Sequence, residues 1–129
     1  MKYLKKFEEV DRSLNKEDKS EIVGIFQSII SDDNFYEYEG TYDNNQILYK
    51  ITDNSINIYV GRNCLEEFKN IIPKIKHFIE VAEDYGYYPH ILNNYQKKKR
   101  FRTELEDYTN YLIEFFKHGG NPNPLTILL

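Results

Sequence analysis

Near the N-terminus the apolar positions recur every three or four residues, which is the spacing of one helix face. A narrow stripe predicts a short first helix; its members are Leu4, Phe7, Val10 and Leu14. A broader stripe predicts a second helix over residues 16–31; its members are Ile22, Ile25, Phe26, Ile29 and Ile30. The polar sequence Ser-Asp-Asp-Asn at 31–34 favours a turn after this helix.

Three runs rich in Tyr, Ile and Val follow, and we predict them as strands: 35–42, 46–52 and 55–60. Short polar segments at 43–45 and 53–54 separate the runs, so we expect an antiparallel meander. In the third run Ile56, Ile58 and Val60 alternate with polar residues. One face of the sheet therefore needs a covering layer of helices.

The strongest helical pattern begins with Asn63 and Glu66, which have the spacing of a capping box. A long apolar stripe follows them. Pro73 interrupts the stripe, and because proline removes one helical hydrogen bond we expect either a kink or two consecutive helices. Gly86 predicts that the pattern ends near Tyr85.

The C-terminal part of the chain mixes ambiguous and clear signals. Residues 87–92 fit either an extended segment or a short helix that begins at Pro89, and we favour the helix. A second capping box, Thr103 with Glu106, starts a final helix that ends at the paired glycines 119–120. The last five residues, Leu-Thr-Ile-Leu-Leu, are too apolar to stay in water. We expect them to dock on this chain or on a partner.

These elements predict a single α+β domain over residues 1–129. It consists of two N-terminal helices, a three-stranded antiparallel meander, and two or three C-terminal helices packed on one face of the sheet. The 12 Tyr and 8 Phe can supply much of the core. Cys64 is the only cysteine, which excludes an intramolecular disulfide and favours a reducing compartment. No signal peptide or membrane-spanning run is visible, so we expect a cytoplasmic protein without membrane association.

Residues 20–49 contain no Lys or Arg, but they carry several acidic residues interleaved with tyrosines. Carboxylates complement a basic partner, and tyrosine is enriched among residues that dominate interfaces. The candidate partner-binding residues are Asp32, Asp33, Tyr36, Tyr38, Tyr42 and Asp43. The alternative interpretation is a solvated strand face whose tyrosines are half buried.

The two-residue period of a strand separates these candidates. Tyr36, Tyr38 and Tyr42 would share one face, whereas Glu37 and Glu39 would point to the other. The strand carboxylates and the strand tyrosines then cannot form one patch. The acids in the flanking turns are therefore the stronger candidates.

A run of five basic residues precedes the predicted final helix: Lys97, Lys98, Lys99, Arg100 and Arg102. Tyr95 and Phe101 lie within or beside it, which makes the segment a candidate for binding single-stranded nucleic acid, another phosphate-bearing ligand or an acidic protein. The net charge of −4 opposes general nucleic-acid binding. Two further interpretations are a solvated helix face or connector, and a partner for the acidic turns, within the chain or across a homodimer.

No motif predicts an active site, a metal site or a cofactor. We expect Cys64 at the first position of a helix, where backbone N–H groups can lower a thiol pKa. No His or acid is placed to activate it, so we favour an inert cysteine. His77, His90 and His118 lack the spacing of zinc ligands. The acidic turns lack the glycine and distal glutamate of an EF-hand, and phosphate-binding glycine motifs do not occur.

The sequence therefore favours a non-catalytic protein-binding factor, such as an inhibitor, an immunity or antitoxin-like protein, or a phage-type antagonist. Its expected partner is a protein with a basic surface. The first alternative is a nucleic-acid-associated or regulatory module that uses residues 97–102. The second is an enzyme whose site converges from residues distant in the sequence.

Overall fold

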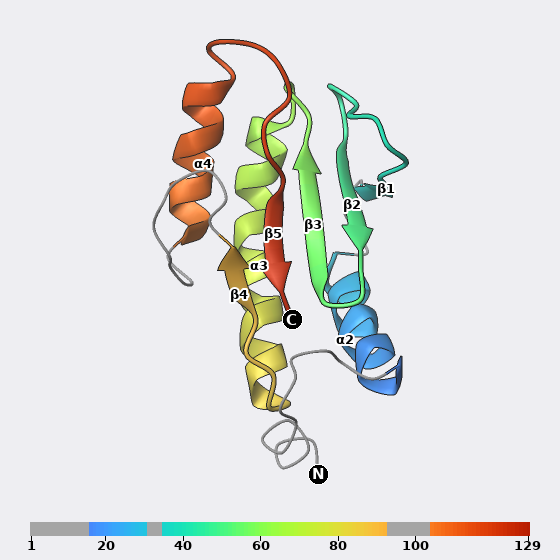
Figure 1. The fold of residues 1–129 in the computed structure, drawn as a ribbon. Coiled ribbons are helices and arrows are strands. Elements are labelled where there is room, and N and C mark those ends of the chain that lie inside the picture. Colours follow the sequence, from blue (N-terminus) through green and yellow to red (C-terminus); the bar gives the residue numbers. More distant parts are fainter. Residues whose placement is uncertain (1–15, 31–34, 93–103) are drawn as a thin grey trace.

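The computed structural model describes residues 16–30, 35–92 and 104–129, and Figure 1 labels their helices and strands. The helices are α2 (Lys16–Ile29), α3 (Leu65–Asp84) and α4 (Glu104–Phe115). The strands are β1 (Phe35–Glu37), β2 (Ile47–Ile51), β3 (Ser55–Val60), β4 (His90–Leu92) and β5 (Leu125–Leu128). The strands form one mixed sheet in the order β1-β2-β3-β5-β4 (Figure 1). The chain therefore has the α+β class that its sequence predicts.

The pairing of β1 differs from the prediction. β1 runs parallel to β2, whereas β2–β3, β3–β5 and β5–β4 are antiparallel. The expected three-stranded meander is therefore wrong at its first strand, although β2 and β3 form the expected hairpin. The loop over residues 38–46 returns the chain to the end of the sheet at which β1 began, and β2 then runs in the same direction. Gly40 in this loop has a φ of 103°, which favours glycine.

One helix precedes the sheet within the described residues. This helix, α2, agrees with the predicted second helix at 16–31. The predicted first helix, from Leu4 to Leu14, lies outside the described residues.

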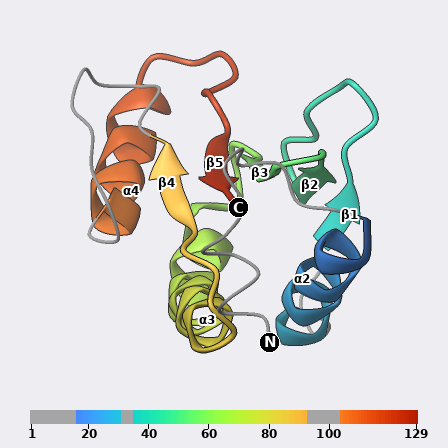
Figure 2. The same ribbon diagram turned by 60° about the horizontal axis from the view of Figure 1, so that its bottom comes forward.

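Helices α2 and α3 cover the same face of the sheet (Figure 2). Phe26 of α2 makes edge-to-face contacts with Phe78 of α3 and Tyr49 of β2, with ring centroids 5.4 and 6.2 Å apart. Four strand residues on this face are fully buried: Ile56, Ile58, Leu125 and Ile127. The hydrophobic core therefore lies between this sheet face and the helices, as the alternation in the third predicted strand requires.

The start and middle of α3 differ from the prediction in two respects. α3 is one helix with Pro73 inside it, so the alternative of two consecutive helices is wrong. The residue at its N-cap is Cys64 and not Asn63. The side-chain amide of Asn63 instead donates a hydrogen bond of 2.8 Å to the Asn45 side chain. This contact crosses 18 residues of sequence, so local spacing could not predict it.

The end of α3 agrees with the prediction. Gly86 has a φ of 92°, and its N–H donates to the carbonyl of Glu83. The N–H of Tyr87 donates to the carbonyl of Ala82. These two bonds make a Schellman motif, which reverses the chain and buries the Tyr87 side chain in the core.

The predicted short helix over residues 87–92 is wrong. Residues 90–92 form strand β4 instead. β4 pairs with β5, and β5 lies between β3 and β4. The apolar tail therefore docks within its own chain. Local sequence patterns could not predict which strands the tail pairs with, because α4 separates β5 from β4 along the chain.

Helix α4 packs beside α3, as the contact between Phe68 and Tyr108 shows, with ring centroids 5.6 Å apart. Lys76 and Glu106 form an ion pair of 2.8 Å between the two helices, and this hydrogen bond lowers the pKa of Glu106. In the residues that the structure describes, no helix is long and apolar enough to cross a bilayer.

Candidate protein-binding surface

The edge strand β1 carries the first part of the surface. Tyr36 is 48% exposed, and Glu37 is also exposed. Tyr36 pairs with Leu48 and Glu37 with Tyr49. Because Tyr49 contacts Phe26 of α2, Glu37 lies on the helix-covered face, and Tyr36 lies on the opposite face. The two side chains therefore point to opposite faces, as the strand period predicts.

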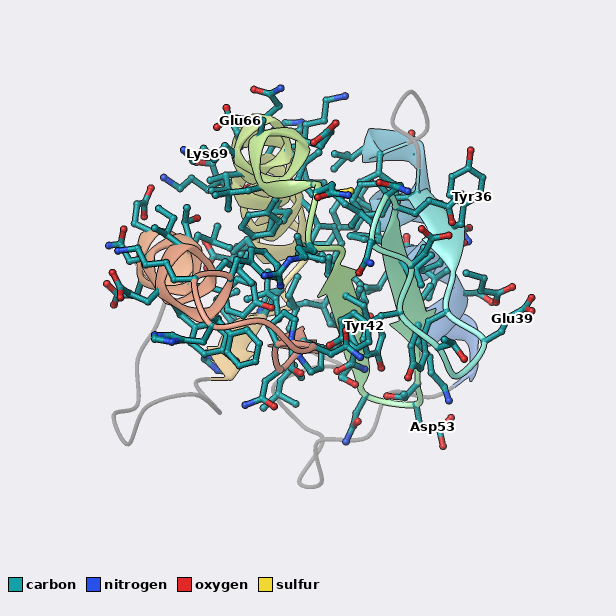
Figure 3. The ribbon with its side chains drawn as sticks, turned by 90° about the horizontal axis from the view of Figure 1, so that it is seen from above. Tyr36, Glu39, Tyr42, Asp53, Glu66 and Lys69 are labelled. Carbon is teal, nitrogen blue, oxygen red and sulfur yellow. The ribbon has the colours of Figure 1, made fainter. Side chains whose placement is uncertain are left out.

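The loop that follows β1 adds two exposed carboxylates, Glu39 and Asp43. Figure 3 shows Tyr36 and Glu39 projecting outward on the same side of the molecule. We call the four residues Tyr36, Glu37, Glu39 and Asp43 the β1 rim. They share the edge strand and the loop that follows it, although Tyr36 and Glu37 point to opposite faces of the sheet. The charged members of this rim are all acidic, and no Lys or Arg occurs between residues 20 and 49.

Asp43 has a fixed position on the rim. Its carboxylate accepts a hydrogen bond of 2.8 Å from the N–H of Asn45, which closes an Asx-turn. The N–H of Asn63 donates to the carbonyl of Asn44 and ties this turn to the start of α3. The Asp43 carboxylate is therefore both a turn-forming group and an exposed charge.

Tyr38 and Tyr42 belong to a packed aromatic cluster with Tyr59 of β3. The rings of Tyr38 and Tyr59 are stacked at 3.9 Å with 9° between their planes, and Tyr42 contacts both rings edge-on. The Tyr42 hydroxyl donates to the carbonyl of Pro122. Burial, followed by the neighbouring tyrosines, raises the pKa of Tyr42, and burial also raises that of Tyr59.

This cluster separates Tyr36 from the other two candidate tyrosines. Figure 3 shows Tyr42 nearer the centre of the molecule, whereas Tyr36 extends from its margin. Tyr38 and Tyr42 therefore support the surface from within, and Tyr36 is the most exposed of the three candidate tyrosines. The sequence alone does not indicate that Tyr59 belongs to this surface. The pattern that could have identified Tyr59 is the alternation of Ile56, Ile58 and Val60 with polar residues, because it predicts that Tyr59 faces away from the core.

Beside the aromatic cluster, the sheet face opposite α2 and α3 carries a short polar network. Figure 1 looks onto this face, with the described helices behind the sheet. The Thr126 hydroxyl donates to Asn57 Oδ1 at 2.7 Å, and Asn57 Nδ2 donates to the Ser55 hydroxyl at 3.2 Å. These polar groups satisfy one another and connect β3 to β5.

Several predicted site residues lie outside the described residues. They are the turn acids Asp32 and Asp33 and the basic residues Lys97, Lys98, Lys99, Arg100 and Arg102. Pairing between the acidic turns and the basic run therefore stays a prediction. The ranges 16–30, 35–92 and 104–129 contain no group of three or more His, Cys, Asp or Glu placed to hold a metal ion.

Burial dominates the electrostatic environment of Cys64. Burial raises the pKa of its thiol, with further contributions from the carboxylates of Glu67 and Asp43. A backbone hydrogen bond from Gly61 lowers the pKa, but this effect is smaller. Backbone N–H groups at a helix start can lower a thiol pKa, but at Cys64 burial has the larger effect.

Cys64 should accordingly react slowly with thiol reagents. At pH 8 we expect the folded protein to react with a chromogenic disulfide about tenfold or more slowly than the protein in urea, because a buried thiol reacts only after local opening. The rate should rise as pH increases, since the thiolate is the reactive form. Equal rates in the folded and unfolded protein would contradict this account of the site.

Comparison of the chain with models of protein families, with curated proteins and with solved structures gives no significant match in any of the three.

Proposed function

We propose that this chain is a non-catalytic protein-binding factor, of the inhibitor, immunity or antitoxin-like, or phage-type antagonist class. It binds another protein through the β1 rim, and the partner presents a basic surface. The observation that carries this proposal is the composition of the rim, which has three exposed carboxylates and an exposed tyrosine in a segment without Lys or Arg.

Two features of the rim favour a protein partner. Carboxylates attract a basic surface and repel the phosphates of nucleic acids. The stacked Tyr38 and Tyr59 and the tethered Tyr42 hold the base of the β1–β2 loop in one conformation. A surface that is already ordered loses little conformational entropy when it binds.

The test compares two variants with the same change in charge. The rim variant is Glu37→Lys with Glu39→Lys, and the control is Glu80→Lys with Asp84→Lys on exposed positions of α3. The partner is captured from native cells with the tagged chain, identified by mass spectrometry, purified, and titrated calorimetrically at low and high salt. We expect the rim variant to bind about tenfold or more weakly, and the control within about twofold of the original chain.

Asp43→Asn adds a finer comparison, because it removes the charge and keeps the oxygen that accepts from Asn45. We expect an intermediate loss of affinity with an unchanged thermal unfolding midpoint. If the rim variant folds normally and binds every captured partner with the affinity of the original chain, the rim is not the interface and the proposed function is wrong.

A further inference from the structure

β1 presents an edge of the sheet that another strand can extend. It is an end strand of the described sheet, and its single partner there is β2 (Figure 2). The N–H of Tyr38 donates to the carbonyl of Tyr49 in β2. Backbone groups alternate in direction along an extended chain, so the N–H and carbonyl of Glu37 and Phe35 point away from β2. These outward groups are the ones that an added strand would use.

The side chains along this edge specify the kind of strand that fits. Glu37 lies on the face that α2 and α3 cover, and Tyr36 lies on the opposite face. An added strand would therefore place alternate side chains beside a carboxylate and beside an exposed aromatic ring. Basic residues match the first position, and residues with an apolar surface match the second.

A second copy of this chain fits the edge poorly. Two copies of β1 paired with Glu37 opposite Glu37 would set like charges side by side, which is destabilising in neighbouring strands. β1 is also a short edge strand that carries a charge, and both features commonly protect a sheet edge against pairing between identical chains. The charge of the edge thus selects a partner of the opposite sign.

The geometry points to strand addition at the β1 edge: an extended segment of a partner protein, with Lys or Arg alternating with apolar residues, hydrogen-bonds to the outward backbone groups of β1. This inference rests on the proposed function and specifies its binding mode. Backbone hydrogen bonds would supply affinity, and the alternating side chains would supply specificity.

The first experiment uses two synthetic peptides of equal charge. One is an acetylated and amidated hexapeptide of alternating Lys and Val, and the other has the same sequence with every backbone amide N-methylated. The methylated peptide keeps its charge but cannot donate backbone hydrogen bonds. We expect the unmodified peptide to bind the full chain about tenfold more tightly. Hydrogen exchange measured by NMR should slow at the N–H of Glu37 and change little at the N–H of Tyr38, which is already bonded.

The second experiment changes the edge itself. Glu37→Pro removes an outward N–H without removing a β1–β2 hydrogen bond, so the sheet should remain intact. Glu37→Gln is the matched control, because it removes the same charge and keeps the N–H. We expect the proline variant to bind the unmodified peptide about tenfold more weakly than the glutamine variant. Circular dichroism of both variants checks that they fold.

The outcomes separate this inference from the proposed function. If both peptides bind equally and Glu37 exchange is unchanged, strand addition is wrong, whereas binding of a basic surface by side chains survives. This comparison uses the unmodified protein, so it holds even if Glu37→Pro fails to fold. If the captured partner is insensitive to charge reversal at Glu37 and Glu39, the proposed function itself fails.

Discussion

Replacement of Gly61 by alanine is expected to lower the free energy of unfolding by about 3 kcal/mol, the upper part of the usual range for overpacking. A Cβ atom on Gly61 would lie 2.1 Å from the carbonyl oxygen of Asp43 and 2.7 Å from that of Gln46. Both are backbone atoms, so no side-chain rotation relieves the clash. The N–H of Gly61 also donates to the Gln46 carbonyl, and the loop cannot retreat without weakening that bond.

Gly24 provides the matched control for this substitution. It lies in α2 and is exposed, and a Cβ atom added there would meet nothing within 4 Å beyond its own helix backbone. Gly24→Ala should therefore raise stability by about 0.5–1 kcal/mol, because alanine loses less conformational entropy in a helix. Urea unfolding followed by circular dichroism measures both effects. Equal shifts for Gly61→Ala and Gly24→Ala would show that the close approach at Gly61 is not present in solution.

The Gly61 contact also bears on the rim. The backbone of the Asp43 turn rests against Gly61, so an alanine there must displace the turn before it can be accommodated. A variant that still folds should thus lose part of the affinity that depends on Asp43. This effect would be separate from any change at Glu37, which is in β1, or at Glu39, which lies two residues beyond it.

The helices were predictable because their signals are local. The apolar period of α2, the long stripe of α3 and the glycine after α3 each lie within a few turns of chain, and packing in the fold agrees with them. Pro73 did not divide α3. Its apolar neighbours Ile71, Ile75 and Phe78 are buried in the core, and this burial outweighs the lost hydrogen bond.

The strand pairing was not predictable, because it depends on segments far apart in the sequence. β4 has three residues and pairs with β5, which the chain reaches only after α4. Pro89 suits a helix start as well as an extended segment, so local propensity could not decide between them. The parallel direction of β1 follows from the path of the 38–46 loop, and its composition predicts a turn without fixing that path.

The acidic charge of the candidate surface could be predicted from the sequence, but the packing of its tyrosines could not. The excess of acid over residues 20–49 is a property of composition and is visible without a structure. The division of the tyrosines between the exposed Tyr36 and the packed pair of Tyr38 and Tyr42 depends on Tyr59 and Pro122. Those two residues come from β3 and from the C-terminal segment, and only the fold brings them there.

A substitution in the C-terminal strand β5 is expected to have the second large effect on stability. Ile127→Ala is expected to lower the free energy of unfolding by about 3 kcal/mol. Ile127 is fully buried and pairs with Ile56 on one side and with Ile91 on the other. Truncation leaves a cavity where three strands meet the helices. Urea unfolding followed by circular dichroism gives the change directly.

Leu128→Ala is the matched control, because it shortens the neighbouring side chain on the opposite face, where Leu128 is partly exposed. We expect a loss of about 1 kcal/mol, consistent with partial burial. Hydrogen exchange supplies an independent measurement: amides of β4 should exchange faster in Ile127→Ala than amides of the β2–β3 hairpin, since β5 is the strand that joins β4 to the described sheet. If the two substitutions cost the same and β4 exchanges no faster than the hairpin, β5 does not lie between β3 and β4 in solution, and the apolar tail must then find its cover on another surface.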